Sequence, residues 1–260
     1  MEKERFSFFN RNSLIIIGEV WHPDNAIGLA FIQHGLSGYK EELHIQCMAD
    51  VFMDHGYTTV LFDATNSFGK SGGSLENISL TSHWQDLEDV LHWAKTEPWY
   101  EAPFILAGHS LGGFSILHLT QKYPDKVKAI APLSTIISGK FRQEAWERFA
   151  PELYAEWKAA GFREEQNPFD QEHMAKIPWS HMEDCLRYDA LANADKITCP
   201  ALLIVGENDQ STPPDQHILL KEKLSGQTEL IIVPDCGHSF KTPEKLLVIK
   251  KAMNKFLSSL

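Results

Sequence analysis

The chain reads Phe104-Ile-Leu-Ala-Gly-His-Ser-Leu-Gly-Gly113 where an apolar strand pattern gives way to a helical one. Its centre, Gly108-x-Ser110-x-Gly112, predicts a sharp strand-to-helix turn that lifts the serine hydroxyl clear of the sheet. Glycine is expected on both sides because a Cβ atom there would collide across so tight a bend. At the start of a helix, backbone N–H groups and the helix dipole favour developing negative charge. The stretch therefore predicts a nucleophilic serine at position 110.

Apolar runs of strand length recur on both sides of this turn, and amphipathic segments separate most of them. Strands are predicted at Phe6–Phe9, Leu14–Trp21, Gly28–Gln33, Thr58–Asp63, Phe104–Ala107, Val127–Pro132, Ala201–Val205 and Glu229–Val233. Helices are predicted at Glu41–His55, Ser82–Lys95, Leu111–Tyr123, Pro214–Leu224 and Pro243–Leu257, the second with Thr81 or Ser82 as its N-cap. The first two strands, joined by Asn10-Arg11-Asn12, are expected to form an antiparallel hairpin. The alternation predicts the α/β class, with a mostly parallel eight-stranded sheet flanked by helices.

The segment from Ser134 to Lys196 interrupts this alternation. It has no convincing strand pattern, and helical patterns rich in aromatic and acidic residues take over. Nine of the 48 residues 141–188 are aromatic, almost one in five, against 11% for the whole chain. This excess predicts a separate subdomain laid over the sheet. Its aromatic residues either form the subdomain's own small core or line a pocket for an acyl or aryl group, and both interpretations stay open.

Composition excludes several classes of protein. The 260 residues are 43% hydrophobic and 23% charged, which is ordinary for a globular chain and not for a disordered or fibrous one. With 24 basic and 35 acidic residues the net charge is −11, so neither nucleic acid nor a membrane surface is expected as a partner. The widely separated cysteines disfavour a zinc ribbon or a disulfide framework. With no export signal or long apolar run either, a cytoplasmic location is expected.

A serine hydroxyl needs a base to take its proton, and that base needs an acid to orient it. His238 follows the last predicted strand, and Asp209 follows the strand before it. Both are therefore expected at the carboxyl edge of the sheet with Ser110, where sites of parallel α/β proteins form. The chain order serine, aspartate, histidine also matches the order known for a nucleophile on such a turn. Glu207 and Asp235 remain rival carboxylates, the first very close to a strand end and the second local to the histidine.

A tetrahedral oxyanion must also be held by preorganised donors. The turn at the serine supplies the N–H of Leu111. A second donor is expected from the loop after the third strand, where Gly35 lets the backbone turn in and leaves the N–H of Leu36 facing the site. His34 in the same loop is interpreted as a hydrogen-bonding scaffold rather than a base.

The ordered set His34-Gly35, Gly108-His-Ser110-Leu-Gly112, Asp209 and Gly237-His238 resembles the α/β-hydrolase family, over essentially the whole chain. It is most similar to the branch of feruloyl esterases and monoacylglycerol lipases. Members of that branch insert a helical cap after the sixth strand, where Ser134–Lys196 falls. The resemblance thus implies a core made of residues 1–133 and 197–260, with a cap at 134–196.

Two positions depart from the pattern of these relatives. In the stretch Phe62–Gly73 relatives commonly have an Asp, an Arg-Gly pair and then Gly-x-Ser, whereas this chain has Ala64-Thr65-Asn66. Since that Arg is usually structural, the change bears on the packing of the loop rather than on the triad. Esterases acting on hydroxycinnamates often carry Gln after the nucleophile, and here Leu111 weakens a feruloyl assignment.

The sequence therefore predicts a serine carboxylesterase that hydrolyses short-chain or aryl carboxylic esters through an acyl-enzyme. A peptidase or thioesterase could use the same machinery, because fold and triad do not fix the acyl group. A slow-turnover ligand receptor on the same scaffold is a third hypothesis. No cofactor or metal is expected, since the histidines lack ligand spacing. The expected partner is a small-molecule ester, and the chain is expected to be a monomer or homodimer.

Overall fold

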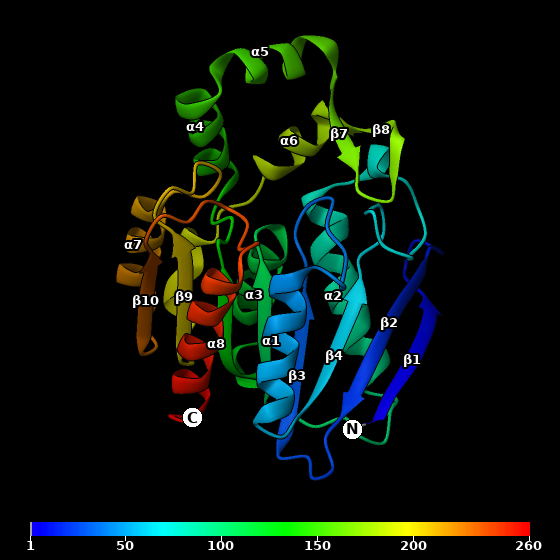
Figure 1. Cartoon of the computed structure of the whole chain (residues 1–260), viewed down its shortest axis with the longest axis vertical. Coiled ribbons are helices and arrows are strands. Elements are labelled where there is room, and N and C mark those ends of the chain that lie inside the picture. The colour runs from blue at the N-terminus through cyan, green and yellow to red at the C-terminus, as the bar shows by residue number, and fades with distance from the viewer. Residues whose placement is uncertain (1) are drawn as a thin grey trace.

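The computed structural model describes residues 2–260, and within them the central feature is an eight-stranded sheet (Figure 1). The strand order is β1-β2-β4-β3-β5-β6-β9-β10. The strands are β1 (Glu2–Phe9), β2 (Ile15–His22), β3 (Gly28–Gln33), β4 (Tyr57–Asp63), β5 (Phe104–His109), β6 (Val127–Leu133), β9 (Ala201–Gly206) and β10 (Thr228–Val233). β2 pairs antiparallel with β1 and β4, and the other neighbours are parallel. The predicted mostly parallel sheet is confirmed.

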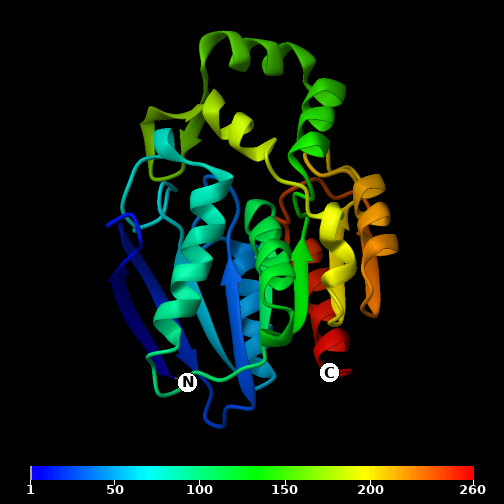
Figure 2. The ribbon, with the colours of Figure 1, turned by 180° about the vertical axis from the view of Figure 1, so that it is seen from behind.

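Helices cover both faces of this sheet. The helices of the core are α1 (Leu43–Asp54), α2 (Leu80–Ala94), α3 (Leu111–Lys122), α7 (Pro214–Lys223) and α8 (Pro243–Leu257), with short 3₁₀ turns at Leu75–Asn77 and Pro124–Lys126. α1 and α8 lie side by side on one face, and their apolar sides form one core layer with the sheet (Figure 1). α2, α3 and α7 form the second core layer on the other face (Figure 2). The central strands are buried on both sides, which explains their almost continuous apolar sequences.

The start of α2 differs from the prediction. Its N-cap is Ser79, whose Oγ accepts from the N–H of Ser82, while the N–H of Ser79 donates back to the Ser82 hydroxyl. This reciprocal pair satisfies donors that the first turn would otherwise leave open. Thr81, one of the two residues predicted as the cap, instead donates its N–H and hydroxyl to the Asp184 carboxylate at 2.8 Å.

Residues 134–196, called the cap segment below, lie above the carboxyl edge of the sheet (Figure 1). They form α4 (Gly139–Phe149), α5 (Pro151–Ala160), β7 (Phe162–Asn167), β8 (Asp170–Pro178), α6 (Trp179–Cys185) and a 3₁₀ turn at Leu191–Lys196. The prediction that this segment contains no strand is wrong, because β7 and β8 form an antiparallel hairpin. The half-buried positions of β7 include Arg163 and Glu165 where a strand normally has apolar residues, so the period-two signal is missing.

A small apolar cluster attaches the cap segment to the core. Tyr154, Trp157 and Ile177 of the cap segment pack with Leu75 and Ile78, which belong to the core loop between β4 and α2. The Trp157 indole N–H also donates to the Ile177 carbonyl oxygen at 3.0 Å. Tyr154 and Trp157 therefore serve packing, as one of the two interpretations expected, although the cluster that they form is shared with the core loop.

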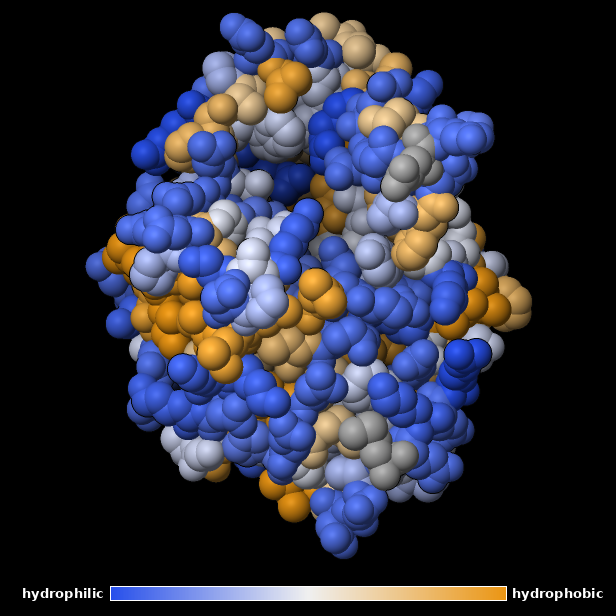
Figure 3. All heavy atoms as spheres, viewed as in Figure 1, coloured by the Kyte–Doolittle hydropathy of each residue, from blue (hydrophilic) through white to orange (hydrophobic). Residues whose placement is uncertain are grey.

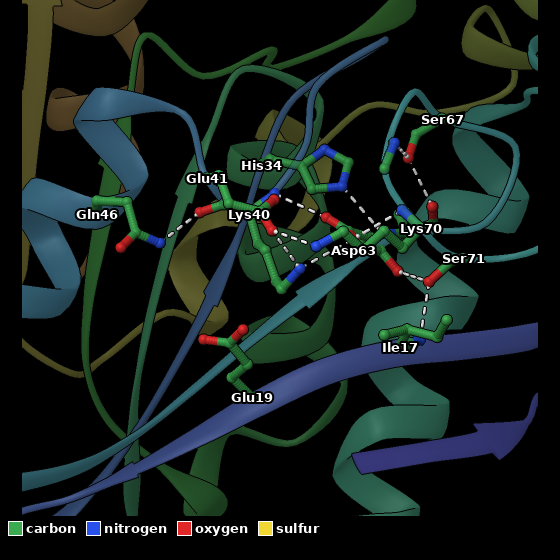
Figure 4. A network of polar contacts seen from close by, with 12 residues as sticks. Ile17, Glu19, His34, Lys40, Glu41, Gln46, Asp63, Ser67, Lys70 and Ser71 are labelled. Carbon is green, nitrogen blue, oxygen red and sulfur yellow. Dashed lines mark hydrogen bonds and ion pairs between the residues drawn. The ribbon is translucent and has the colours of Figure 1, made fainter. Parts of the chain in front are cut away.

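A buried carboxylate ties together the loops at the end of β3 and β4 (Figure 4). Asp63 is fully buried and accepts the amide N–H of Lys40 at 2.8 Å, the Lys40 ammonium at 3.2 Å and the amide N–H of Lys70 at 2.9 Å. The same ammonium pairs with Glu41 at 2.7 Å. Since one acid holds both loops, the position of the loop that carries Leu36 depends on it.

The loop that departs from the relatives' Arg-Gly pattern has its own anchor. The buried carboxylate of Asp86 accepts the N–H and hydroxyl of Thr65 at 2.7 and 2.8 Å, and the Asn10 amide at 2.7 Å. Burial raises the pKa of Asp86 to about 6, against the lowering effect of these hydrogen bonds. Thr65 thus packs this loop onto α2 without an arginine.

Among the described residues, no helix combines the length and the apolar character needed to cross a membrane.

We expect Asp63→Ala to lower the free energy of unfolding by about 3–5 kcal/mol, because it leaves two amides without their acceptor and removes one of the two carboxylates that pair with the buried Lys40 ammonium. Glu229→Ala is the matched control. It removes an ion pair with Lys255 that is exposed, and should change the free energy by less than about 1 kcal/mol. Urea unfolding followed by tryptophan fluorescence measures both. Equal effects of the two substitutions would contradict a special role for the buried acid.

Candidate active site

Ser110 connects β5 to α3 in a strained backbone conformation. Its φ is 54° and its ψ is −110°, a region that residues with a side chain seldom adopt. Its N–H donates to the Leu133 carbonyl oxygen at 2.9 Å, and its carbonyl oxygen accepts from the N–H groups of Phe114 and Ile136 at 3.1 Å. Hydrogen bonds from β6, α3 and the residues after β6 therefore hold the turn in place.

The glycines of the turn are required by close backbone contacts. A Cβ atom on Gly108 would lie 2.6 Å from the Gly112 carbonyl oxygen. A Cβ atom on Gly112 would collide with the carbonyl oxygens of Gln33 and His34. A Cβ atom on Gly35 would lie 3.1 Å from the Cβ of Ser110. The predicted reason for glycine on both sides of the serine therefore agrees with the geometry.

The structure brings the three predicted side chains into one hydrogen-bonded chain. The Ser110 Oγ lies 2.9 Å from His238 Nε2, and His238 Nδ1 lies 2.9 and 3.1 Å from the two carboxylate oxygens of Asp209. The tautomer that fits both contacts has its proton on Nδ1, so that Nε2 accepts from the serine hydroxyl. The rivals Glu207 and Asp235 are hydrogen-bonded to each other, with the Asp235 N–H 3.0 Å from the Glu207 carboxylate.

Asp209 is held as an ionised group beside the imidazole. Besides His238, its carboxylate accepts the N–H groups of Ser211 and Thr212 at 2.9 Å and the Thr212 hydroxyl at 2.8 Å. Burial by itself raises the pKa of Asp209, but the charge of His238 and these hydrogen bonds outweigh it and lower the pKa to about 2. The carboxylate therefore stays charged throughout the neutral pH range.

Sequence reasoning missed His109, which positions the loop that carries His238. The His109 Nε2 lies 3.0 Å from the His238 carbonyl oxygen, so this nitrogen donates its proton. Burial lowers the pKa of His109 well below its ordinary value, which keeps the ring neutral. The Gly-x-Ser-x-Gly pattern contains this residue only as an unspecified position. The sequence therefore offers one indication of a role for His109, which is its position next to Ser110.

The N–H groups of Leu36 and Leu111 remain the predicted oxyanion donors. Neither the N–H of Leu36 nor that of Leu111 donates to another described residue. His34 is fully buried, its Nε2 accepts the Ala64 N–H at 2.9 Å, and its Nδ1 donates to the Gly35 carbonyl oxygen at 2.8 Å. Since both ring nitrogens bond to backbone, His34 holds the loop and is not free to act as a base.

A cavity of about 610 Å³ opens over Ser110, between the core and the cap segment. Figure 3 shows the molecule hollowed between the two, with strongly hydrophilic atoms deep in the hollow. The cap segment contributes Arg142, Trp146, Phe149, Leu153, Arg163 and Glu165 to its lining, and the core contributes Leu36, Tyr39, Glu42, Phe68, His238 and Lys241. The cap aromatics thus have two roles: Trp146 and Phe149 line the cavity, whereas Tyr154 and Trp157 belong to the apolar cluster between the cap segment and the core.

Glu42 places a second titratable acid in the cavity wall. Burial raises the pKa of Glu42 to about 7. The hydrogen bond from the Tyr39 backbone and the charges of Lys241 and His238 lower this pKa, but their effect is smaller. One of its carboxylate oxygens has no hydrogen-bond partner among the described residues. At neutral pH this wall of the cavity therefore carries only part of a negative charge.

Comparison with known proteins gives the same architecture. Residues 24–242 match the model of the family described as Serine aminopeptidase, S33 (Hydrolase_4). A mitochondrial palmitoyl-protein thioesterase of Mus musculus is 24% identical over 241 residues, which is 92% of this chain and 78% of that protein. A thermostable monoacylglycerol lipase of Bacillus sp. (strain H-257) is 22% identical over 223 residues, 82% of this chain and 83% of that protein. The structure of Est1E from Butyrivibrio proteoclasticus with ferulic acid bound matches with a TM-score of 0.78 at 21% identity, over 98% of each chain.

The expected fold is therefore confirmed, and the match to the family model covers most of the chain, including positions 110, 209 and 238. The curated relatives and the structural neighbour carry names of a thioesterase, a lipase and a protein with bound ferulic acid. The chain belongs to the Serine aminopeptidase, S33 (Hydrolase_4) family and is an α/β hydrolase with esterase-, thioesterase- and lipase-like homologues.

Proposed function

We propose that the chain is a serine hydrolase that cleaves short-chain or aryl carboxylic esters through an acyl-enzyme intermediate. The observation that carries this proposal is the unbroken hydrogen-bonded path from the Ser110 hydroxyl through His238 to Asp209, which opens into the cavity. Such a path gives a weak nucleophile the base and the orienting acid that it needs.

In the proposed mechanism, the Ser110 Oγ attacks the ester carbonyl carbon while His238 Nε2 takes the hydroxyl proton. Asp209 holds the imidazole in the required tautomer and stabilises the imidazolium that forms. The N–H groups of Leu36 and Leu111 stabilise the tetrahedral oxyanion. Its collapse breaks the bond to the alcohol, which leaves with the proton held by His238. Water then attacks the acyl-enzyme by the same steps in reverse, releasing the acid and restoring the serine.

The cavity supports an ester with a compact acyl or aryl part. Its volume is in the range of small-molecule sites, and Trp146, Phe149 and Leu153 provide apolar and aromatic walls. A thioester is the second candidate substrate, favoured by the similarity to a palmitoyl-protein thioesterase. The chemistry at Ser110 is the same for both, so the acyl and leaving groups alone distinguish them.

We expect Ser110→Ala to lower kcat for 4-nitrophenyl butyrate by at least about 10³-fold, because it removes the attacking oxygen while leaving the fold intact. Ser7→Ala, an exposed serine of β1, is the control and should keep full activity and full labelling by a fluorophosphonate. Steady multiple turnover by the wild type distinguishes an enzyme from a receptor. Activity or labelling that survives in Ser110→Ala would place the nucleophile elsewhere.

We expect Asp209→Asn to lower kcat by about 10³- to 10⁴-fold at pH 7, because the amide no longer stabilises the imidazolium or fixes the tautomer. Asp215→Asn is the matched control, since that exposed carboxylate pairs with the exposed Arg148 and lies outside the cavity. Steady-state kinetics with the same ester measures both, and circular dichroism checks the fold. A loss of less than tenfold in Asp209→Asn would return the orienting role to Glu207 or Asp235.

A further inference from the structure

One buried cation in the cavity wall is left without a partner. Arg142, on α4, is only 7% exposed, yet among the described residues its guanidinium has no hydrogen-bond or ion-pair partner, and its Nε is closed off from solvent. Burial lowers the pKa of Arg142, which shows that its charged form is destabilised where it lies. Since arginine stays protonated in proteins, this charge is retained at a cost to stability.

Arg163, a second arginine of the cap segment, has contacts that explain a structural role. Arg163 pairs with Glu165, and its guanidinium carbon lies 5.6 Å from the Trp146 ring centre and 5.3 Å from that of Trp157. These contacts join β7 to α4 and α5. Among the described residues Arg142 forms no ion pair and lies over no aromatic ring, and Glu165, whose charge acts on it, is already paired with Arg163. The packing of the cap segment therefore does not account for its charge.

The charges around Arg142 leave an unbalanced positive charge in the cavity. Arg163 and Glu165 form an ion pair. Lys241 and Glu42 line the same cavity, and Glu42 offsets the Lys241 charge only in part because it is partly protonated at neutral pH. Arg142 therefore adds a positive charge that no ion pair among the described residues balances, within a chain whose net charge is −11. A surplus cation at this place favours a ligand with one negative charge.

The chemistry of the guanidinium selects the kind of anion. Its planar donors match the two oxygens of a carboxylate in a bidentate contact. A single carboxylate also balances the charge of Arg142, whereas a doubly charged phosphate beside it would leave a negative charge buried.

We infer that Arg142 binds a free carboxylate that the substrate carries in addition to the ester bond cleaved at Ser110. This inference rests on the proposed function, because it takes the hydrolysed ester as the reacting group. The preferred substrates are then anionic esters, in which the carboxylate lies under the cap segment while the ester carbonyl lies at the serine.

Two matched pairs of esters test the preference. The acyl pair is the 4-methylumbelliferyl monoester of adipic acid against 4-methylumbelliferyl hexanoate, and the alcohol pair is 4-butyryloxybenzoate against its methyl ester. We expect wild-type kcat/KM to be at least about tenfold higher for the anionic member of one pair, after correction for spontaneous hydrolysis. Equal values in both pairs would overturn the inference while leaving the esterase proposal intact.

Arg142→Met is the decisive variant, since it keeps an unbranched apolar stem and removes the charged guanidinium. We expect it to lower kcat/KM for the anionic ester by about ten- to a hundredfold and to change the neutral ester less than about threefold. Arg148→Met, which removes an exposed arginine of the same helix, should change neither. Equal losses on both esters would show that Arg142 acts through structure and would overturn the inference.

Two further measurements do not depend on catalysis. Calorimetry on Ser110→Ala should detect binding of monoethyl adipate that Arg142→Met weakens by about tenfold or more, with no such effect on diethyl adipate. If no ester is hydrolysed, the esterase proposal fails, yet this binding still tests the carboxylate site. Thermal unfolding of Arg142→Met should occur at the same or a higher temperature, because an unpaired buried charge has been removed. Earlier unfolding by several degrees would assign Arg142 to holding the cap segment and would overturn the inference.

Discussion

The positive φ of Ser110 is the constraint on which the rest of the site depends. A serine in this conformation persists only where the surroundings over-determine it, and here the hydrogen bonds to Leu133, Phe114 and Ile136 do so from separate elements. The same bend demands the absence of a Cβ atom at positions 108 and 112. Because of this bend, the Ser110 hydroxyl points away from the sheet at the edge where the loops that carry Asp209 and His238 lie. The strained turn therefore brings together three side chains that are distant in the sequence.

Sequence patterns predicted those parts of the molecule whose signal is local and repeated. The core strands could be found because they are buried on both faces, and the predicted triad because each member follows a strand at the same edge. The hairpin β7–β8 could not be found, because its inward positions include Arg163 and Glu165. The roles of His109 and Arg142 could not be predicted from the sequence either. They depend on burial and on which groups lie nearby, and these are properties of the folded chain.

The core and the cap segment contribute different kinds of groups to one cavity. The core presents neutral or hydrogen-bonded groups whose states are fixed by burial: His34 and His109 stay neutral, and Asp209 stays charged. The cap segment adds aromatic surface at Trp146 and Phe149 together with the unbalanced charge of Arg142. Bond cleavage is thereby proposed to belong to the core, and discrimination between ligands to residues 134–196.

The attachment of the cap segment to the sheet has an evolutionary consequence. The chain leaves the sheet at the end of β6 and returns at β9, and these two strands are neighbours, with Leu133 opposite Ile204. An insertion between adjacent strands crosses no other connection, so it can grow, shrink or be exchanged without altering the register of a single ladder. Recombination at this one junction can therefore exchange the cap segment, and with it the groups that contact a ligand. The hydrolase core is then inherited unchanged.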